Sequence, residues 1–290
     1  MNEQEIQALI ALLDDSDREV FDHVSSKLLS LGPQVIEKLE DAYTSIPDPL
    51  VQERIEIIIH QIQFEGIEKD ILQWSRNESD NLLEGVLIVT RHQYPELNEE
   101  KVNKFLSRVK KDIWIGLNHY LSPLEQMNVV NQTLFGHYSL TGNNNTEQEQ
   151  SISYLNNVIE TSKGNHFSLG LLYLTLCQQL EMPVYGVCLS SHFILVRTKD
   201  YIVDFNDTEK LKNDILFYVN PFNKGLAFSE REINIYLKKL ELDPQNKYFL
   251  PASNTTIIKE YISFLSKFYS KPDEHQKAND LNRLSDLISD

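Results

Sequence analysis

The chain has 290 residues, of which 41% are hydrophobic, a composition that suits a globular protein with roughly one to three cores. Its formal net charge of −16 repels phosphate backbones and anionic lipids, which argues against nucleic acid and membrane surfaces as partners. Two cysteines are too few for a secreted disulfide scaffold, no apolar stretch approaches the ~20 residues that span a bilayer, and no basic N-terminal segment typical of a signal peptide is present. We therefore expect a cytoplasmic protein.

Residues 1–76 predict a run of amphipathic helices. Apolar residues recur at helical spacing, and the segment DDSD (14–17) offers caps for the second helix. Gly32 and Pro33 end that helix and begin a third, and IPDP (46–49) separates a fourth. The recurrence of acid, turn, helix and glycine resembles HEAT repeats, helix pairs that stack into a solenoid. A plain four-helix cap on the next domain is the alternative.

Residues 80–135 predict further helices, followed by a long polar loop. Pro95 marks a turn and Asn98 an N-cap, because apolar residues at helical spacing follow. The loop, residues 137–151, is rich in asparagine. Since loops of this length are usually functional or mobile, we expect it to border a cleft.

The segment 165–228 has a different sequence pattern. It predicts a helix over about 165–180 and then short strands rich in β-branched residues. The predicted strands are VYGVCL (184–189), HFILVRT (192–198), YIVDF (201–205) and ILFYVNPF (215–222), with a hairpin turn at 199–200. A helix begins at Ser229, where Glu232 completes a capping box.

The tail, 250–290, predicts two helices separated by KPDEHQ (271–276). A helical hairpin of this length resembles a tetratricopeptide-type unit.

The order helix, strand with histidine, strand with acid or amide is typical of papain-like and transglutaminase-like enzymes. Their nucleophilic cysteine lies at a helix start, where the helix dipole stabilises a thiolate, and a histidine on a following strand shares its proton. In this chain the helix start offers His166, Phe167 and Ser168, and no cysteine.

Several spaced motifs resemble the bacterial SirB-type family, whose core is transglutaminase-like and commonly lacks that cysteine. They are KGNHFSLG at the helix start, SSHFILV at the histidine strand and FYVNPFNKG at 217–225, with similar leading segments upstream. The likeness covers about residues 80–290. It implies an α+β fold in which a helix packs on a small antiparallel sheet, with the transglutaminase-like domain at 80–240, preceded by HEAT-like helices and followed by the tetratricopeptide-like hairpin at 250–290.

The resemblance implies degenerate triad positions at Ser168, His192 and Asn220. Ser168 could be a nucleophile activated by His192, or a first-turn serine that bonds the local backbone. His192 could lie in a cleft or be a satisfied structural histidine. Asn220 stands where the family has aspartate, and an amide can orient a histidine but cannot stabilise its charge. Asp204 is the rival orienting group, since a hairpin would bring it towards His192.

Other polar residues around these positions are candidates for ligand binding: Asn165, His166, Asp204 and Asn223. A zinc site built from His166, His192 and Asp204 is conceivable, but no ligand spacing supports it. No nucleotide or zincin motif occurs, so we expect neither metal nor cofactor.

The two cysteines have separate predictions. Cys177 lies on an apolar helix face and is expected in the core. Cys188 is four residues before His192, so strand alternation predicts that both lie on one face of the sheet. A thiol on this strand could not lie at the helix start, so we do not expect Cys188 to be the nucleophile.

Two classes of function fit this sequence. The first is a pseudoenzyme whose surviving cleft binds a protein or peptide, in a regulatory role. The alternative is a weak hydrolase or acyl-transferase that uses Ser168, His192 and Asn220. A serine hydroxyl is a weaker nucleophile than a thiolate and needs a strong base, which favours the first class.

Overall fold

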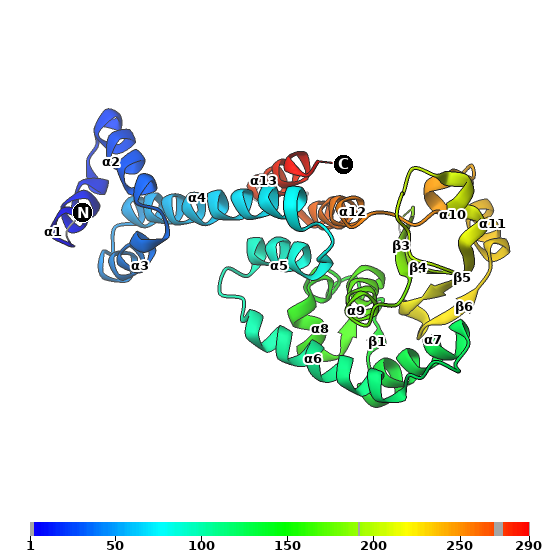
Figure 1. Cartoon of the computed structure of the whole chain (residues 1–290). Helices are drawn as coiled ribbons and strands as arrows, with labels where there is room; N and C mark the ends of the chain where they lie inside the picture. The colour runs from blue at the N-terminus through cyan, green and yellow to red at the C-terminus, as the bar shows by residue number, and fades with distance from the viewer. Residues whose placement is uncertain (1–2, 191, 270–274, 290) are drawn as a thin grey trace. The chain divides into compact units, whose positions relative to one another are not determined.

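The computed structural model describes residues 3–190, 192–269 and 275–289 (Figure 1). Contacts divide the chain into two compact units, Met1–Asp70 and Ile71–Asp290. The sequence-based divisions were 1–76, 80–240 and 250–290, and the last two lie in one unit here. Of the tail break KPDEHQ, residues 271–274 lie outside the described residues.

The first unit is helical and has its own core. Its elements are α1 (Glu3–Ala11), η1 (Leu12–Asp14), α2 (Arg18–Leu31), η2 (Gly32–Val35), α3 (Ile36–Ser45) and most of α4 (Pro49–Gln73). Asp17 caps α2 by accepting from the Glu19 N–H, and Gly32 ends it at φ +68°. Leu13, Leu28 and Leu39 are fully buried at the centre of the unit.

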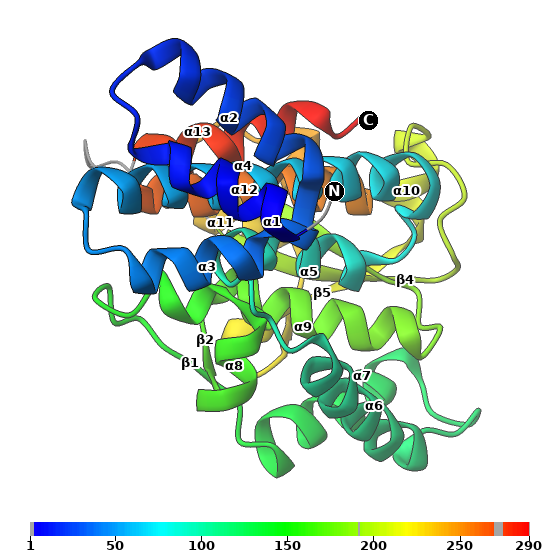
Figure 2. The same cartoon turned by 90° about the vertical axis from the view of Figure 1, so that its left-hand side faces the viewer.

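The second unit begins with helices. They are η3 (Trp74–Glu78), α5 (Leu82–Gln93), α6 (Glu99–Gly116), α7 (Pro123–Asn131), η4 (Gln132–His137), η5 (Ser151–Ser153), α8 (Leu155–Thr161) and α9 (His166–Gln179). Two very short strands, β1 (Thr141–Gly142) and β2 (Lys163–Gly164), pair in parallel. In the turned view of Figure 2, β1, β2 and α8 lie beside one another at one end of α9.

A four-stranded antiparallel sheet follows, in the order β3 (Val184–Leu189), β4 (His192–Thr198), β5 (Ile215–Asn220) and β6 (Leu226–Phe228). One face packs on α9, where Phe193 lies so close to Gly170 that an added Cβ would fall 2.3 Å from its ring. Ile194, Val196 and Tyr218 of the other face form a core with α11 (Glu230–Lys239). Figure 1 shows the sheet between α9 and α11. The α+β prediction is confirmed.

The remaining elements are α10 (Thr208–Asp214), η6 (Pro221–Asn223), η7 (Asn246–Tyr248), α12 (Asn254–Ser266), η8 (Lys267–Tyr269) and α13 (His275–Leu287). The helix α12 packs against α5 and β3. No described helix is both long and apolar enough to cross a bilayer.

The predicted strand at 201–205 is wrong. The place beside β4 is taken by β5, which pairs with Leu195–Thr198. Asp204 instead makes a tight turn, accepting from the backbone N–H of Asn206 at 2.8 Å, and Asp207 then caps α10. Val203 is 88% exposed and Tyr201 56% exposed, while Ile202 and Phe205 are half-buried.

Candidate functional site

The start of α9 is held by Asn165, which is buried and acts as N-cap. Its Oδ1 accepts from the backbone N–H groups of Phe167 (3.0 Å) and Ser168 (2.9 Å). Its Nδ2 donates to Ser153 Oγ at 2.7 Å. Asn165 therefore both caps the first turn of α9 and joins this turn to η5.

Ser168 completes this cap and is itself buried, with 1% of its surface exposed. Its Oγ accepts from the Asn165 N–H at 3.0 Å and donates to the Ile152 carbonyl at 2.6 Å. A hydroxyl has a single hydrogen, and here that hydrogen points to a backbone carbonyl rather than to an imidazole. This geometry corresponds to the local backbone role that the sequence offered as the alternative to a nucleophile.

The side chain that meets His192 at the helix start is His166. The two imidazole rings are stacked, with centroids 5.1 Å apart and planes inclined by 27°. The Phe193 N–H donates to His166 Nδ1 at 3.0 Å, which leaves the ring hydrogen of the neutral imidazole on Nε2. On the other side of the pair, the Tyr236 hydroxyl lies 2.6 Å from His192 Nδ1. Helix α11 thus fixes one ring and β4 fixes the other.

Both imidazoles are neutral near pH 7. Burial, with smaller contributions from His192 and Lys267, lowers the pKa of His166 to about 3. Burial also lowers the pKa of His192 from its ordinary value. A stacked neutral pair can donate and accept hydrogen bonds, but it does not present a fixed positive charge to a ligand.

The histidine pair opens into a small pocket of about 240 Å³. It is lined by Asn143, Asn144, Thr146, Glu149, Asn165, His166, His192 and Phe222. Four of these residues belong to the asparagine-rich loop, so the prediction that this loop borders the cleft is confirmed. The loop is anchored by the Asn143 N–H, which donates to the Gly164 carbonyl at 2.9 Å directly before α9.

Asn220 lies at the end of β5, on the same side of the sheet as His192. The register pairs Leu195 with Val219, so Asn220 comes opposite Ile194, two residues from His192 along β4. Its Oδ1 accepts from the Asn223 N–H at 3.2 Å and caps η6. The amide of Asn220 therefore shapes the Pro-Phe-Asn turn that brings Phe222 to the pocket, and Asn223 contributes through its backbone.

The turn after η6 is fixed from α7. Asn131 Nδ2 donates to the Gly225 carbonyl at 2.9 Å, and Asn131 Oδ1 accepts from the Tyr173 hydroxyl at 2.8 Å. Gly225 has φ +71°, and a Cβ there would fall 1.8 Å from Asn131 Oδ1. Only glycine fits this position.

Asp204 lies beyond the far end of β4 from His192. A seven-residue strand is roughly 20 Å long, so the predicted hairpin that would join Asp204 to His192 does not form. The conceivable zinc set of His166, His192 and Asp204 is therefore not assembled. The described residues contain no group of three or more metal-ligating side chains.

The prediction that Cys188 shares a face with His192 is wrong. Cys188 pairs with Phe193 and His192 pairs with Leu189, and paired residues of adjacent strands share a face, so the side chains of Cys188 and His192 lie on opposite faces. Burial raises the pKa of Cys188 to about 12 and that of Cys177 further still. Both thiols therefore stay protonated.

Tyr236 is the site residue that sequence reasoning missed. It lies 44 residues after His192 on an amphipathic helix, and nothing in its local pattern distinguishes it from an ordinary half-buried tyrosine. Phe222 lies in the motif FYVNPFNKG that the sequence analysis singled out. Its place in the pocket, beside residues of the asparagine-rich loop, is known only from the structure.

Comparison with known proteins agrees with this architecture. Residues 100–262, more than half of the chain, match the profile of the transglutaminase-like superfamily. UPF0162 proteins from two strains of Xylella fastidiosa are each 26% identical over 161 residues, 54% of this chain and 51% of theirs. The UPF0162 protein of Vibrio cholerae is 22% identical over 202 residues, 68% of this chain and 69% of its own.

The chain thus spans about half the length of the Xylella relatives. No solved structure matches. The profile match over the α9–sheet core shows that the chain belongs to the transglutaminase-like superfamily.

Proposed function

We propose that this protein is a transglutaminase-like pseudoenzyme whose cleft, at the His166–His192 pair, binds a peptide or a protein in the cytoplasm. The observation that carries the proposal is the state of Ser168, whose buried hydroxyl donates to the Ile152 carbonyl. Where the superfamily mechanism needs a nucleophile beside a histidine, this chain has a second, neutral imidazole.

The pocket suits recognition of polar backbone groups. His166 offers its Nε2–H, and the asparagine loop offers amide donors and acceptors, which together match the N–H and C=O groups of an extended peptide. The net charge of −16 argues against nucleic acid or anionic membrane as the ligand. The proposal includes the resemblance to the SirB-type family. In it, the HEAT-like helices and the tetratricopeptide-like tail offer further surfaces for proteins, because such repeats commonly bind proteins.

The alternative, a weak hydrolase or acyl-transferase using Ser168, His192 and Asn220, has less support. Ser168 would have to break its bond to Ile152 and leave the core, and Asn220 Oδ1 is engaged by Asn223. No geometric observation favours this activity.

Labelling with a serine-directed fluorophosphonate separates the two functions. We expect no labelling of the full chain under conditions that label a control serine hydrolase. Labelling that disappears in both Ser168→Ala and His192→Ala would overturn the pseudoenzyme proposal.

A photo-crosslinking amino acid at Asn144, which lines the pocket, tests binding inside cells. We expect a crosslinked polypeptide that is absent when the probe replaces Asn103, an exposed residue of α6, and that is weakened by His192→Ala. Equal crosslinking from both positions, or no effect of His192→Ala, would contradict a ligand in this cleft.

A further inference from the structure

The outer edge of β5 is covered along only half of its length. β5 runs from Ile215 to Asn220, but β6 pairs only with Tyr218, Val219 and Asn220. Among the described residues, no strand lies beside Ile215–Phe217 on that side. Because backbone groups of a strand point alternately to its two sides, this half of the edge offers hydrogen-bonding groups without a neighbouring strand.

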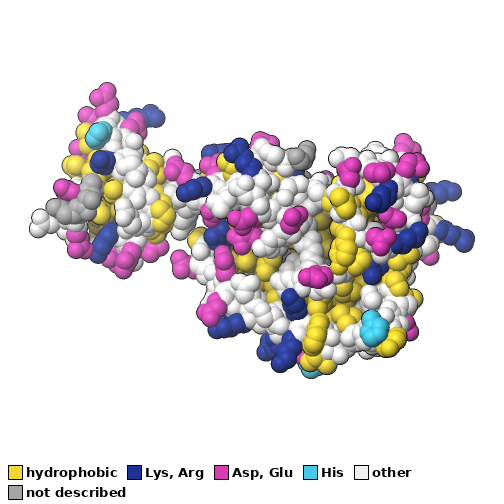
Figure 3. Space-filling model, viewed as in Figure 1, with side chains coloured by type: hydrophobic (Ala, Val, Ile, Leu, Met, Phe, Trp, Pro, Cys, Tyr) yellow, Lys and Arg dark blue, Asp and Glu magenta, His cyan; other side chains and the backbone are white. Residues whose placement is uncertain are grey.

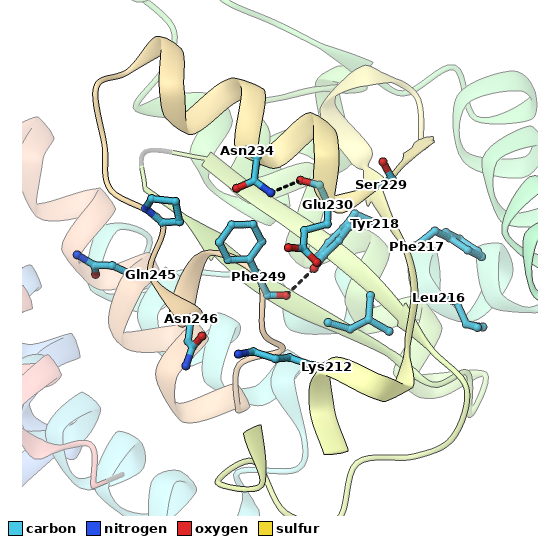
Figure 4. Close-up of a pocket in the computed structure, with 12 residues that line it drawn as sticks. Lys212, Leu216, Phe217, Tyr218, Ser229, Glu230, Asn234, Gln245, Asn246 and Phe249 are labelled. Atoms are coloured by element: carbon cyan, nitrogen blue, oxygen red, sulfur yellow. Dashed lines mark hydrogen bonds between the residues drawn. The ribbon is translucent and has the colours of Figure 1, made fainter. Parts of the chain in front are cut away.

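A pocket of about 440 Å³ lies at this uncovered edge (Figure 4). It is lined by Lys212, Ile215, Leu216, Phe217, Tyr218, Ser229, Glu230, Asn234, Pro244, Gln245, Asn246 and Phe249. This volume is within the roughly 300–1,000 Å³ of ligand sites in proteins. The pocket is therefore bounded by β5, by the start of α11 and by the segment that follows α11.

The floor of the pocket is apolar and fixed. The Tyr218 hydroxyl donates to the Phe249 carbonyl at 3.0 Å, which ties β5 to the 244–249 segment. Burial, with the charge of Glu230 adding to it, raises the pKa of Tyr218, so this hydroxyl keeps its hydrogen. Ile215 and Phe249 are partly buried beside it.

The rim of the pocket is polar and carries both charges. Lys212 and Glu230 are exposed and lie on opposite sides of the floor in Figure 4. Asn234, also exposed, donates from its Nδ2 to the Glu230 carbonyl at 3.1 Å. Basic and acidic side chains are interspersed over this end of the unit, around α10 and α11, in Figure 3.

We propose that the uncovered edge of β5 binds an extended peptide segment of a partner protein as an added strand that continues the line of β6. Main-chain hydrogen bonds to Ile215–Phe217 supply the pairing, and an apolar side chain of the peptide fills the floor between Ile215, Tyr218 and Phe249. Charged residues on either side of that apolar residue meet Lys212 and Glu230. A compact small molecule could fill the floor, but it would leave the strand edge uncovered, whereas a peptide satisfies both.

This site is distinct from the histidine cleft. It lies at the Ile215 end of β5, while Asn220 and Phe222 are near the cleft at the other end. The inference therefore goes beyond the proposed function and can fail separately from it.

The test uses heptapeptides selected from a phage-displayed library on the full-length protein, then synthesised with a fluorophore for anisotropy. Asn234→Trp places a large ring over the pocket. Lys238→Trp, one turn further along the same exposed side of α11 and outside the pocket, is the matched control. N-methylation of each peptide amide in turn measures which backbone N–H groups bind.

We expect Asn234→Trp to weaken binding at least tenfold, with binding to Lys238→Trp unchanged. N-methylation should weaken binding at alternate residues only, since a paired strand uses every second N–H on one side. The inference is overturned if no selected peptide responds to Asn234→Trp, or if N-methylation acts without alternation. Loss of binding in Thr146→Trp, at the histidine pocket, with binding to Asn234→Trp unchanged, would place the peptide in the histidine cleft and would also overturn the inference.

Discussion

His166 is an imidazole kept neutral by burial, and this makes it a source of acid sensitivity. Its pKa in the folded protein, about 3, is below the ordinary value of 6.5, so the unfolded chain takes up the proton first as the pH falls. The stability that the folded protein gains from keeping His166 neutral is complete above pH 6.5, and it is lost progressively as the pH falls towards 3. The lowered pKa of His192 acts in the same direction.

We predict that the free energy of unfolding falls between pH 7 and pH 4.5, and that His166→Gln reduces this fall by about 2 kcal/mol. Glutamine keeps an acceptor for the Phe193 N–H but does not titrate. Urea unfolding of both proteins at the two pH values measures the difference. Identical pH dependence in both would show that His166 takes up no proton on unfolding in this range.

Gly225 carries a second residue-scale prediction. Gly225→Ala should destabilise the protein by about 2 kcal/mol or more, because the left-handed backbone and the 1.8 Å approach of Asn131 Oδ1 both oppose a Cβ. Gly136→Ala is the matched control, since no atom lies within 4 Å of the added Cβ there. Thermal unfolding of the two variants should differ clearly, and similar melting temperatures would contradict the close packing described for Asn131.

At the scale of elements, the cap of α9 combines local and tertiary bonds. Asn165→Ala removes the cap and the bond to Ser153, both buried, and should cost about 2–3 kcal/mol. Asn98→Ala removes an exposed cap of α6, whose Oδ1 accepts from the Lys101 N–H, and should cost about 1 kcal/mol or less. Denaturant midpoints measure both, and equal losses would mean that the tertiary bond contributes nothing.

The elements most accurately predicted from sequence are those with local chemical signals. Asn98 and the Ser229–Glu232 capping box begin helices as expected, and three of the four predicted strands form. The segment 201–205 was predicted incorrectly because its composition favours a strand while the pairing position beside β4 is occupied. Two contacts could not be predicted: that of Tyr236 with His192 and that of the Ile152 carbonyl with Ser168. No local sequence pattern encodes which distant group a given side chain contacts.

At the scale of the molecule, the chain has separate cores in its two units. Leu28→Ala, fully buried in the first unit, should lower stability there by about 2–5 kcal/mol. We expect calorimetry of the full chain to show the lower-temperature shift in one transition only, with hydrogen exchange of α9 amides unchanged. A single transition that shifts as a whole would indicate that the two cores unfold together.

The second unit is closed by contacts between its first and last helices. Asn254 Nδ2 donates to the Ser79 carbonyl across 175 residues of sequence, and the Tyr269 hydroxyl donates to Gln93 Oε1 across 176. During synthesis on the ribosome, the side of α5 that packs on α12 therefore stays uncovered until the last helices have been made. Contacts so distant in sequence make folding slow, and the nascent chain exposes that side for the time it takes to translate the whole sheet.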